Sequence, residues 1–361
     1  MKRIVALVVI CIIFSLPVSA VSTSAKAAAV INGDTGEVLY SQNADTRLPM
    51  ASTTKIMTSL LLCEHGNLEK EITVTADMLK VEGSSMGLLP GDTVTLHDLL
   101  YGMLLASGND AANVTAIAVS GSVKAFAELM NRRAAELGLK NTHFVTPSGL
   151  DAEEHYTTAR ELALLAAFAL KNEEFAKAAA SKTATLCYGN PPYKRTISNH
   201  NKLLKLYDGA IGVKTGFTKK SGRCLVSAAK RDGKLAVAVT LCDPDDWRDH
   251  AALLDYGFSA FEWRSFLRAG ETAGTASVIG GVKDAVGLYA GEALCWPLAP
   301  EETAEVRLHA PRFVFAPVLH GPAGYAELLV NGVPVRRVTV FYRHPVARTP
   351  ETGLLRRLLG G

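Results

Sequence analysis

The chain has 361 residues, a formal net charge of +3 and 48% hydrophobic residues. This length suffices for one large domain and a smaller one, and the nearly balanced charge predicts no nucleic-acid partner. Beyond the N-terminal segment five cysteines remain, at positions without metal-ligand spacing: Cys63, Cys187, Cys224, Cys242 and Cys295. We interpret most of them as small core residues, and a single disulfide stays open.

The N-terminal segment has the layout of a secretory signal peptide. Lys2-Arg3 precede the apolar run Ile4–Leu16, and small residues follow at Val18-Ser19-Ala20. We expect a signal peptide over residues 1–20, which a later cleavage site would extend as far as residue 27. We therefore expect a secreted, extracytoplasmic protein. A retained N-terminal anchor is the alternative, although a run of about 15 residues is short for a membrane span.

The next part of the chain alternates strand and helix patterns. Asn32–Gly36 is rich in turn residues and joins two expected strands. Further elements follow in chain order: a helix from near Pro49, a helix capped by Thr95 and Asp98, another after Asp110, helices over Ser122–Leu137 and Thr158–Leu170, strands within Tyr207–Cys242, and a helix over Ala251–Phe261.

The composition changes near residues 265–275, where glycine, valine and proline become frequent. We expect a catalytic domain over residues 28–265 and a small β domain over 272–345, with a hairpin turn at Asn331-Gly332. Residues 350–361 form a short tail in which four leucines flank Arg356 and Arg357. The tail predicts weak, reversible, peripheral contact with the outer face of the membrane.

A serine and a lysine three residues apart stand at the start of the first expected helix. Residues i and i+3 are neighbours on a helix, so Lys55 can reach the Ser52 hydroxyl. The amides of a first helical turn lack intrahelical partners, so the Ser52 amide can bind a developing oxyanion. The pattern predicts a nucleophilic serine and its lysine base.

Ser-x-x-Lys alone is a weak signal, since a chain of this length contains about one by chance. A second copy, Ser227 to Lys230, lies in an expected strand next to the turn Asp232-Gly233. Its two side chains should lie on opposite faces of that strand. This second copy is therefore rejected as a catalytic pair.

Two further motifs follow Ser52 in a fixed order, Ser107-Gly108-Asn109 at a helix end and Lys214-Thr215-Gly216 on a strand. The trio is that of penicillin-binding proteins and class A β-lactamases. Five longer stretches resemble the low-molecular-mass D-alanyl-D-alanine carboxypeptidases: Ser84–Gly87, Leu104–Asp110, Thr146–Asp151, His155–Arg160 and Gly212–Thr218.

The resemblance implies a mixed α/β fold. A catalytic domain like that of β-lactamases and penicillin-binding proteins, with an antiparallel sheet and a helical subdomain, would precede a small C-terminal all-β domain. It also implies that Ser107 relays a proton, that Asn109 orients Lys55 and the substrate, and that Lys214 and Thr215 face the substrate carboxylate. By the same analogy the Phe217 amide is a second oxyanion donor and Arg248 a further carboxylate ligand, or else only part of a solvated turn.

Gly216 has no side chain, which lets a peptide lie along the strand. A neutral Lys55 requires a lowered pKa, which burial and a nearby Lys214 would both promote. No Glu-x-x-Leu-Asn segment of the kind used for deacylation in class A β-lactamases lies between Asn109 and Lys214. A β-lactam acyl-enzyme should therefore be long-lived.

Together these features predict a serine DD-carboxypeptidase that removes D-alanine from peptidoglycan stem peptides, is inhibited by β-lactams and needs no metal or cofactor. Three alternatives stay open: a β-lactamase or a DD-endopeptidase on the same scaffold, or a catalytically idle wall-binding protein.

Overall fold

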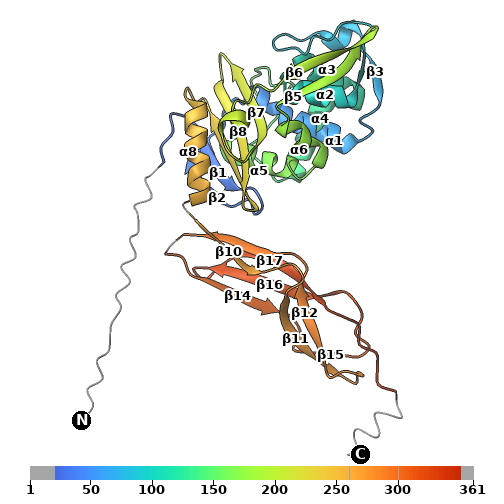
Figure 1. Ribbon diagram of the computed structural model, residues 1–361, viewed down its shortest axis with the longest axis vertical. Coiled ribbons are helices and arrows are strands. Elements are labelled where there is room, and N and C mark those ends of the chain that lie inside the picture. Colours follow the sequence, from blue (N-terminus) through green and yellow to red (C-terminus); the bar gives the residue numbers. More distant parts are fainter. Residues whose placement is uncertain (1–20, 260, 300, 351–361) are drawn as a thin grey trace, which may run out of the picture.

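The computed structural model describes residues 21–259, 261–299 and 301–350. An α/β catalytic domain precedes an elongated C-terminal β domain along the long axis of the molecule (Figure 1). The expected signal peptide and nearly all of the amphipathic tail lie outside the described residues. Within those residues, no helix is both long enough and apolar enough to cross a membrane.

The catalytic domain is built on a five-stranded antiparallel sheet in the order β2-β1-β9-β8-β7. Its strands are β1 (Ala27–Asn32), β2 (Val38–Gln42), β7 (Ala210–Thr218), β8 (Gly222–Arg231) and β9 (Lys234–Leu241). All six residues of β1 are buried. Helix α8 (Asp246–Ser259) covers one face of the sheet and α5 (Ala159–Ala169) the other, which explains the nearly continuous apolar runs.

Asp232 and Gly233 connect β8 to β9 with backbone φ of 50° and 77°, as a tight hairpin turn requires. Ser227 lies on β8, and its hydroxyl bonds to the buried His250 instead of to Lys230. The second Ser-x-x-Lys copy is thus a structural part of the sheet, as the pattern predicted.

A helical subdomain packs against the edge of this sheet. Its elements are η1 (Ala51–Thr54), α1 (Lys55–His65), η2 (Ala76–Leu79), α2 (Leu96–Leu104), α3 (Asn109–Ser120), α4 (Val123–Glu136), α6 (Glu173–Ala180) and α7 (Leu203–Leu206), with a small sheet of β3 (Glu71–Thr73), β4 (Thr93–Thr95), β5 (Thr183–Gly189) and β6 (Pro192–Ser198). The Thr95–Asp98 capping box is present, with the Asp98 amide donating to Thr95 Oγ1 at 3.0 Å.

The segment after Pro49 differs in one respect from the expected helix. Ser52 lies in the short 3₁₀ turn η1, and the α-helix begins only at Lys55. Side chains at i and i+3 eclipse one another in a 3₁₀ turn, so the spacing of Ser52 and Lys55 still brings the two together. The sequence pattern therefore predicted the contact correctly, although the α-helix itself begins three residues after Ser52.

The C-terminal β domain contains two sheets. One pairs β10 (Glu262–Leu267) with β13 (Leu294–Leu298), and the other has the order β14-β16-β17-β12-β11-β15. The remaining strands are β11 (Thr272–Ile279), β12 (Ala285–Ala290), β14 (Ala304–His309), β15 (Phe313–Phe315), β16 (Pro322–Val330) and β17 (Val333–Tyr342). The hairpin at Asn331-Gly332 is confirmed.

The boundary of the β domain lies earlier than expected. Strand β10 pairs with β13, and Phe266 and Leu267 pack on the core around Leu328 and Val340. Residues 262–265, which we had expected in the catalytic domain, therefore belong to the β domain. The five described cysteines are all free thiols.

Candidate active site

Lys55 is fully buried, and its amine meets three oxygen atoms. Its Nζ lies 2.9 Å from Ser52 Oγ, 2.7 Å from Asn109 Oδ1 and 2.6 Å from the carbonyl oxygen of Ser148. The amide and carbonyl oxygens can only accept hydrogen bonds. A neutral amine has two N–H groups for these two acceptors and keeps its lone pair for the Ser52 hydroxyl proton.

The surroundings of Lys55 favour this neutral form. Burial lowers the pKa of Lys55 well below the ordinary range, and the nearby charge of Lys214 lowers it further, while Asp110 acts in the opposite direction. The arrangement therefore places an amine with a lowered pKa directly against the hydroxyl of Ser52.

The Ser148 carbonyl is a contact that sequence reasoning did not assign. It belongs to the turn Thr146–Asp151, which packs directly on η1. Gly149 has φ of +88°, and a Cβ there would lie 1.9 Å from the carbonyl oxygen of Ala51. Only glycine allows this approach. The Pro147-Ser148-Gly149 turn signal was visible in the sequence, but its position against η1 was not.

Ser107 and Lys214 form a second buried serine–lysine pair. Lys214 Nζ donates to Ser107 Oγ at 3.0 Å and to the carbonyl oxygen of Thr215 at 2.9 Å. Burial lowers the pKa of Lys214 to about 7. Ser107 has φ of 58°, a left-handed conformation unusual for a residue with a side chain, in the link between α2 and α3. Such outliers cluster at functional sites.

Asn109 is held from both ends of its amide. Its Oδ1 accepts from Lys55, and its Nδ2 donates to the carbonyl oxygen of Glu82 at 2.6 Å. Gly83 passes so close that a Cβ would lie 2.7 Å from Asn109 Nδ2. These contacts determine which end of the Asn109 amide faces the lysine.

Asp110 is a further buried residue that sequence reasoning missed. Its carboxylate accepts hydrogen bonds from the amides of Met86, Gly87 and Leu88 and from the Ser85 hydroxyl. These donors belong to the Ser84–Gly87 stretch and to Leu88, which directly follows it. Asp110 thus anchors that loop beside the start of α3, next to Asn109.

Strand β7 approaches the nucleophile through Gly216. A Cβ on Gly216 would lie 3.0 Å from the amide nitrogen of Ser52 and 3.1 Å from that of Thr53. Strand β7 is also the edge strand of the five-stranded sheet. An edge strand can add a peptide by main-chain hydrogen bonding, and here that edge passes Ser52.

The structure does not bring Arg248 to β7. Its side chain is 71% exposed and bonds to Asp245 and Asp249 of its own segment. A hollow of about 340 Å³ beside β7 contains another arginine, Arg223. Its lining consists of His200, Thr215, Gly216, Phe217, Arg223, Asp246 and Trp247. Arg223 on β8 is paired with Phe217 on β7. The position of Arg223 beside β7 follows from this strand register, which the sequence pattern did not indicate.

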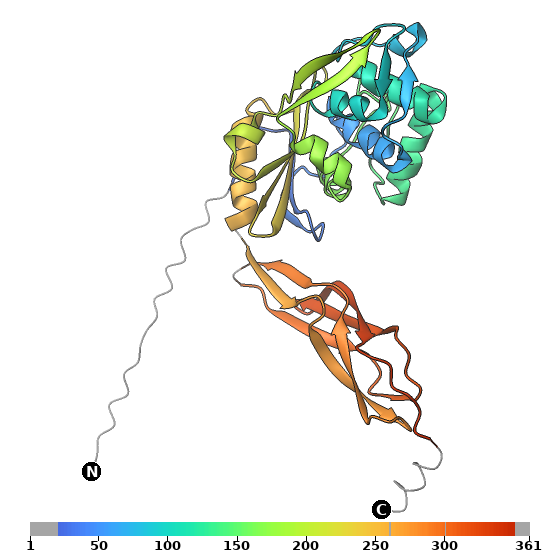
Figure 2. The same ribbon diagram turned by 45° about the vertical axis from the view of Figure 1, so that its right-hand side comes forward.

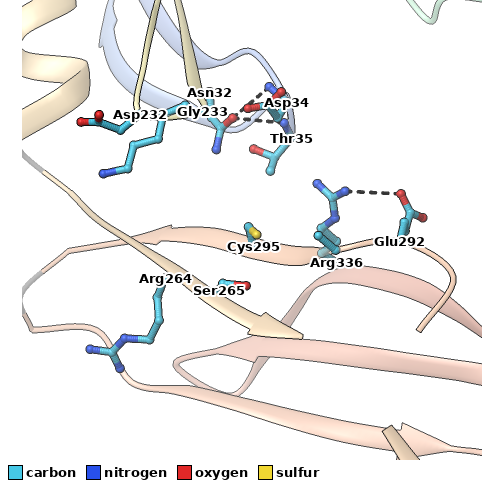
Figure 3. Close-up of a pocket in the computed structure, with 12 residues that line it drawn as sticks. Asn32, Asp34, Thr35, Asp232, Gly233, Arg264, Ser265, Glu292, Cys295 and Arg336 are labelled. Atoms are coloured by element: carbon cyan, nitrogen blue, oxygen red, sulfur yellow. Dashed lines mark hydrogen bonds and ion pairs between the residues drawn. The ribbon is translucent and has the colours of Figure 1, made fainter. Parts of the chain in front are cut away.

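A separate hollow of about 530 Å³ lies between the two domains (Figure 3). Oppositely charged side chains line it, including Asp34 of the catalytic domain and Arg336 and Glu292 of the β domain. None of the sequence-predicted site residues lines it. Across the described residues, no group of His, Cys, Asp and Glu side chains is arranged to hold a metal ion.

A buried amine with a lowered pKa against a serine hydroxyl, beside an open strand edge, is the arrangement of a serine acyl-transfer enzyme. Residues 15–245 match the family described as D-alanyl-D-alanine carboxypeptidase, peptidase S11. The chain belongs to this family of serine hydrolases.

Similarity to known proteins extends over both domains. D-alanyl-D-alanine carboxypeptidase DacF of Bacillus subtilis is 36% identical over 282 residues, which cover 76% of this chain and 72% of that protein. Penicillin-binding protein 5 from Haemophilus influenzae has a TM-score of 0.76 at 26% identity, covering 91% of this chain and 98% of that one. The Streptomyces K15 DD-transpeptidase has a TM-score of 0.63 at 35% identity, covering 66% and 98%.

Proposed function

We propose that this protein is a DD-carboxypeptidase that removes the terminal D-alanine from peptidoglycan stem peptides outside the cytoplasmic membrane. The observation that carries the proposal is the Lys55 amine, whose two acceptors leave its lone pair for Ser52. Family membership supports the substrate class. The signal-peptide layout of residues 1–20 supports the location.

In the proposed reaction Lys55 takes the proton of Ser52, and Ser52 Oγ bonds to the carbonyl carbon between the two D-alanines. The amides of Ser52 and Phe217 bind the oxyanion. As the C–N bond breaks, the proton passes by way of Ser107 to the departing amine, and D-alanine leaves. Water then hydrolyses the ester with Lys55 as the base, which restores Ser52.

Substrate orientation is assigned to β7. The peptide lies along the strand edge beside Gly216, and Lys214, Thr215 and an arginine receive its terminal carboxylate. Arg223 is the arginine in the adjoining hollow, so we propose it for this role ahead of Arg248. A planar guanidinium can bind a carboxylate through two hydrogen bonds.

Two glutamates lie in the segments that most resemble the Glu-x-x-Leu-Asn motif of class A β-lactamases, and the position of each disfavours the β-lactamase alternative. Glu128 lies exposed on α4. Glu161 is buried, and its carboxylate accepts from the amide of Asn141 and the hydroxyl of Thr142. The hydrogen bonds of Glu161 are directed to Asn141 and Thr142 and not to Ser52, so we expect the penicilloyl ester to persist.

The test is intact-protein mass spectrometry with benzylpenicillin and with diacetyl-Lys-D-Ala-D-Ala. We expect a stable penicilloyl adduct on the Ser52 peptide and release of D-alanine. Both should disappear in Ser52→Ala and fall strongly in Lys55→Gln. Lys230→Gln, which changes the lysine of the second Ser-x-x-Lys copy, is the matched control and should label normally.

Other outcomes would support the alternatives. Rapid hydrolysis of penicillin would indicate a β-lactamase, and cleavage of cross-linked muropeptides without release of D-alanine an endopeptidase. Absence of any labelling would indicate an idle wall-binding protein. An adduct that survives Ser52→Ala would remove Ser52 as the nucleophile.

A further inference from the structure

Strand β15 exposes its two largest side chains to solvent. Phe313 and Phe315 are exposed and contact each other edge to face, with ring centroids 6.1 Å apart. Val314 between them packs on the small core around Val278 and Val318. A strand on a core normally buries its large apolar residues. Here the alternation places the aromatic rings outside.

Three more exposed apolar residues belong to the same end of the domain. Ile279 is the direct neighbour of Phe315 in the β11–β15 pairing, while Val282 and Leu319 lie in adjoining loops. We call Ile279, Val282, Phe313, Phe315 and Leu319 the apolar tip. Both views show β15 at the end of the β domain remote from the catalytic domain (Figures 1 and 2).

The backbone beneath the apolar tip is cross-connected. The Val282 amide donates to the carbonyl oxygen of Ala347, and the Thr349 amide to that of Gly280. The Ala316 amide donates to the carbonyl oxygen of Ile279 at 2.9 Å. These bonds join three separate segments, so the side chains project from an ordered platform. Binding through such a platform costs little additional ordering.

Positive charge surrounds the apolar tip. The segments 279–284, 310–321 and 346–350 contain three lysine or arginine residues, Lys283, Arg312 and Arg348, and a single carboxylate, Asp284. Apolar side chains flanked by cations suit the interface of a bilayer with anionic headgroups. The surface area of these five side chains is smaller than the roughly 800 Å² that each partner buries in a typical stable protein interface.

The position of the chain end adds to this argument. Residues 348–350, where the described chain ends, line a hollow of about 520 Å³ together with Ile279 and Phe315. The amphipathic tail therefore starts beside the apolar tip. We propose that the apolar tip inserts into the interface of an anionic membrane and forms a second contact next to the tail. Stable attachment commonly requires two weak signals of this kind.

The test uses the chain from Val21 to Gly361 and vesicles of phosphatidylglycerol and phosphatidylethanolamine. We expect the double variant Phe313→Thr, Phe315→Thr to lower the vesicle partition coefficient roughly tenfold, with or without residues 351–361. Threonine keeps the strand preference of β15. Val333→Thr, equally exposed at the β16–β17 turn, is the matched control and should bind normally.

Two further measurements test the contribution of charge and the possibility of self-association. Lys283→Gln with Arg312→Gln should weaken binding at low salt and have little effect at high salt. All variants should still be labelled by penicillin, which reports that the catalytic domain is folded, independently of vesicle binding. Unchanged partition of the phenylalanine variant would overturn the proposal. A change from dimer to monomer in its sedimentation without vesicles would assign the apolar tip to contact between two copies.

Discussion

The charge of Lys214 lowers the pKa of Lys55, second only to burial of the Lys55 side chain. Both lysines are buried, and each contacts one serine of the site, Lys55 with Ser52 and Lys214 with Ser107. Because two positive charges are unfavourable in one enclosed site, the charge of Lys214 favours the neutral form of Lys55. The pair thus separates a neutral base from a cation that can attract a carboxylate.

The first prediction concerns Lys214→Gln. Without the Lys214 charge, the pKa of Lys55 should rise, and acylation by penicillin should become fast only at a higher pH. The pKa of Lys214 is about 7, so its charge is present below that pH and is lost above it. The difference from the unchanged protein should therefore be largest below pH 7. Stopped-flow acylation rates across pH measure it.

Lys214→Arg is the control for this prediction, because it keeps a positive charge and should retain more of the acid limb of the profile than Lys214→Gln. If the pH profile of acylation in Lys214→Gln coincides with that of the unchanged protein, burial alone lowers the pKa of Lys55.

The second prediction separates the two arginines. Arg223→Ala should raise KM for a peptide with a free C-terminal carboxylate roughly tenfold or more, and should change turnover of the matching neutral ester little. Arg248→Ala should have a small effect on both, since its contacts are with Asp245 and Asp249. Equal effects of Arg223→Ala on peptide and ester would exclude carboxylate recognition. A larger effect of Arg248→Ala than of Arg223→Ala on the KM of the peptide would restore Arg248 as the carboxylate ligand.

Local features of the site could be predicted from the sequence, because short spacings determine them. Ser52 and Lys55 are neighbours in either kind of helical turn, and the Thr95–Asp98 cap and the Asn331-Gly332 turn depend only on adjacent residues. The three strands between Tyr207 and Cys242 could be predicted from their apolar runs and turn signals.

Contacts between distant segments could not be predicted in this way. The Ser148 carbonyl reaches Lys55 across 93 positions, through backbone atoms that have no residue-type signature. Arg223 is placed by the register of β8 against β7, and a sequence pattern does not specify register. The hairpin β5–β6 was also missed, since polar residues cover one of its faces and weaken its apolar pattern.

The third prediction concerns the packing of β7 on the nucleophile. Gly216→Ala places a methyl group 3.0 Å from the Ser52 amide nitrogen, so η1 or β7 must shift by a few tenths of an ångström. We expect acylation to slow roughly tenfold or more while the protein stays folded. Gly287→Ala on β12 is the control, because its nearest contacts would be an ordinary 3.7 Å. Unchanged acylation in Gly216→Ala would mean that the strand yields without moving Ser52.

The last prediction is loss of stability in acid. His250 is buried between the Ser227 and Thr240 hydroxyls, and burial lowers its pKa to about 3. Burial also lowers the pKa of His155 to about 4, with smaller contributions from His143 and Lys55. Unfolded histidine titrates near 6.5, so between about pH 6.5 and 4 the unfolded chain binds more protons than the folded one. Stability present at pH 8 is therefore lost as the pH falls through this window.

At pH 5 each histidine should reduce the free energy of unfolding by about 2 kcal/mol relative to pH 8. All helices of the described chain lie in the catalytic domain, so urea unfolding followed by helical circular dichroism reports this domain. His250→Gln loses hydrogen bonds and should be less stable at pH 8, but its loss between pH 8 and pH 5 should be smaller by about 2 kcal/mol. His65→Gln, at an exposed position in α1, should keep the full loss. If His250→Gln shows the same loss as the unchanged protein, protonation of His250 does not drive unfolding in acid.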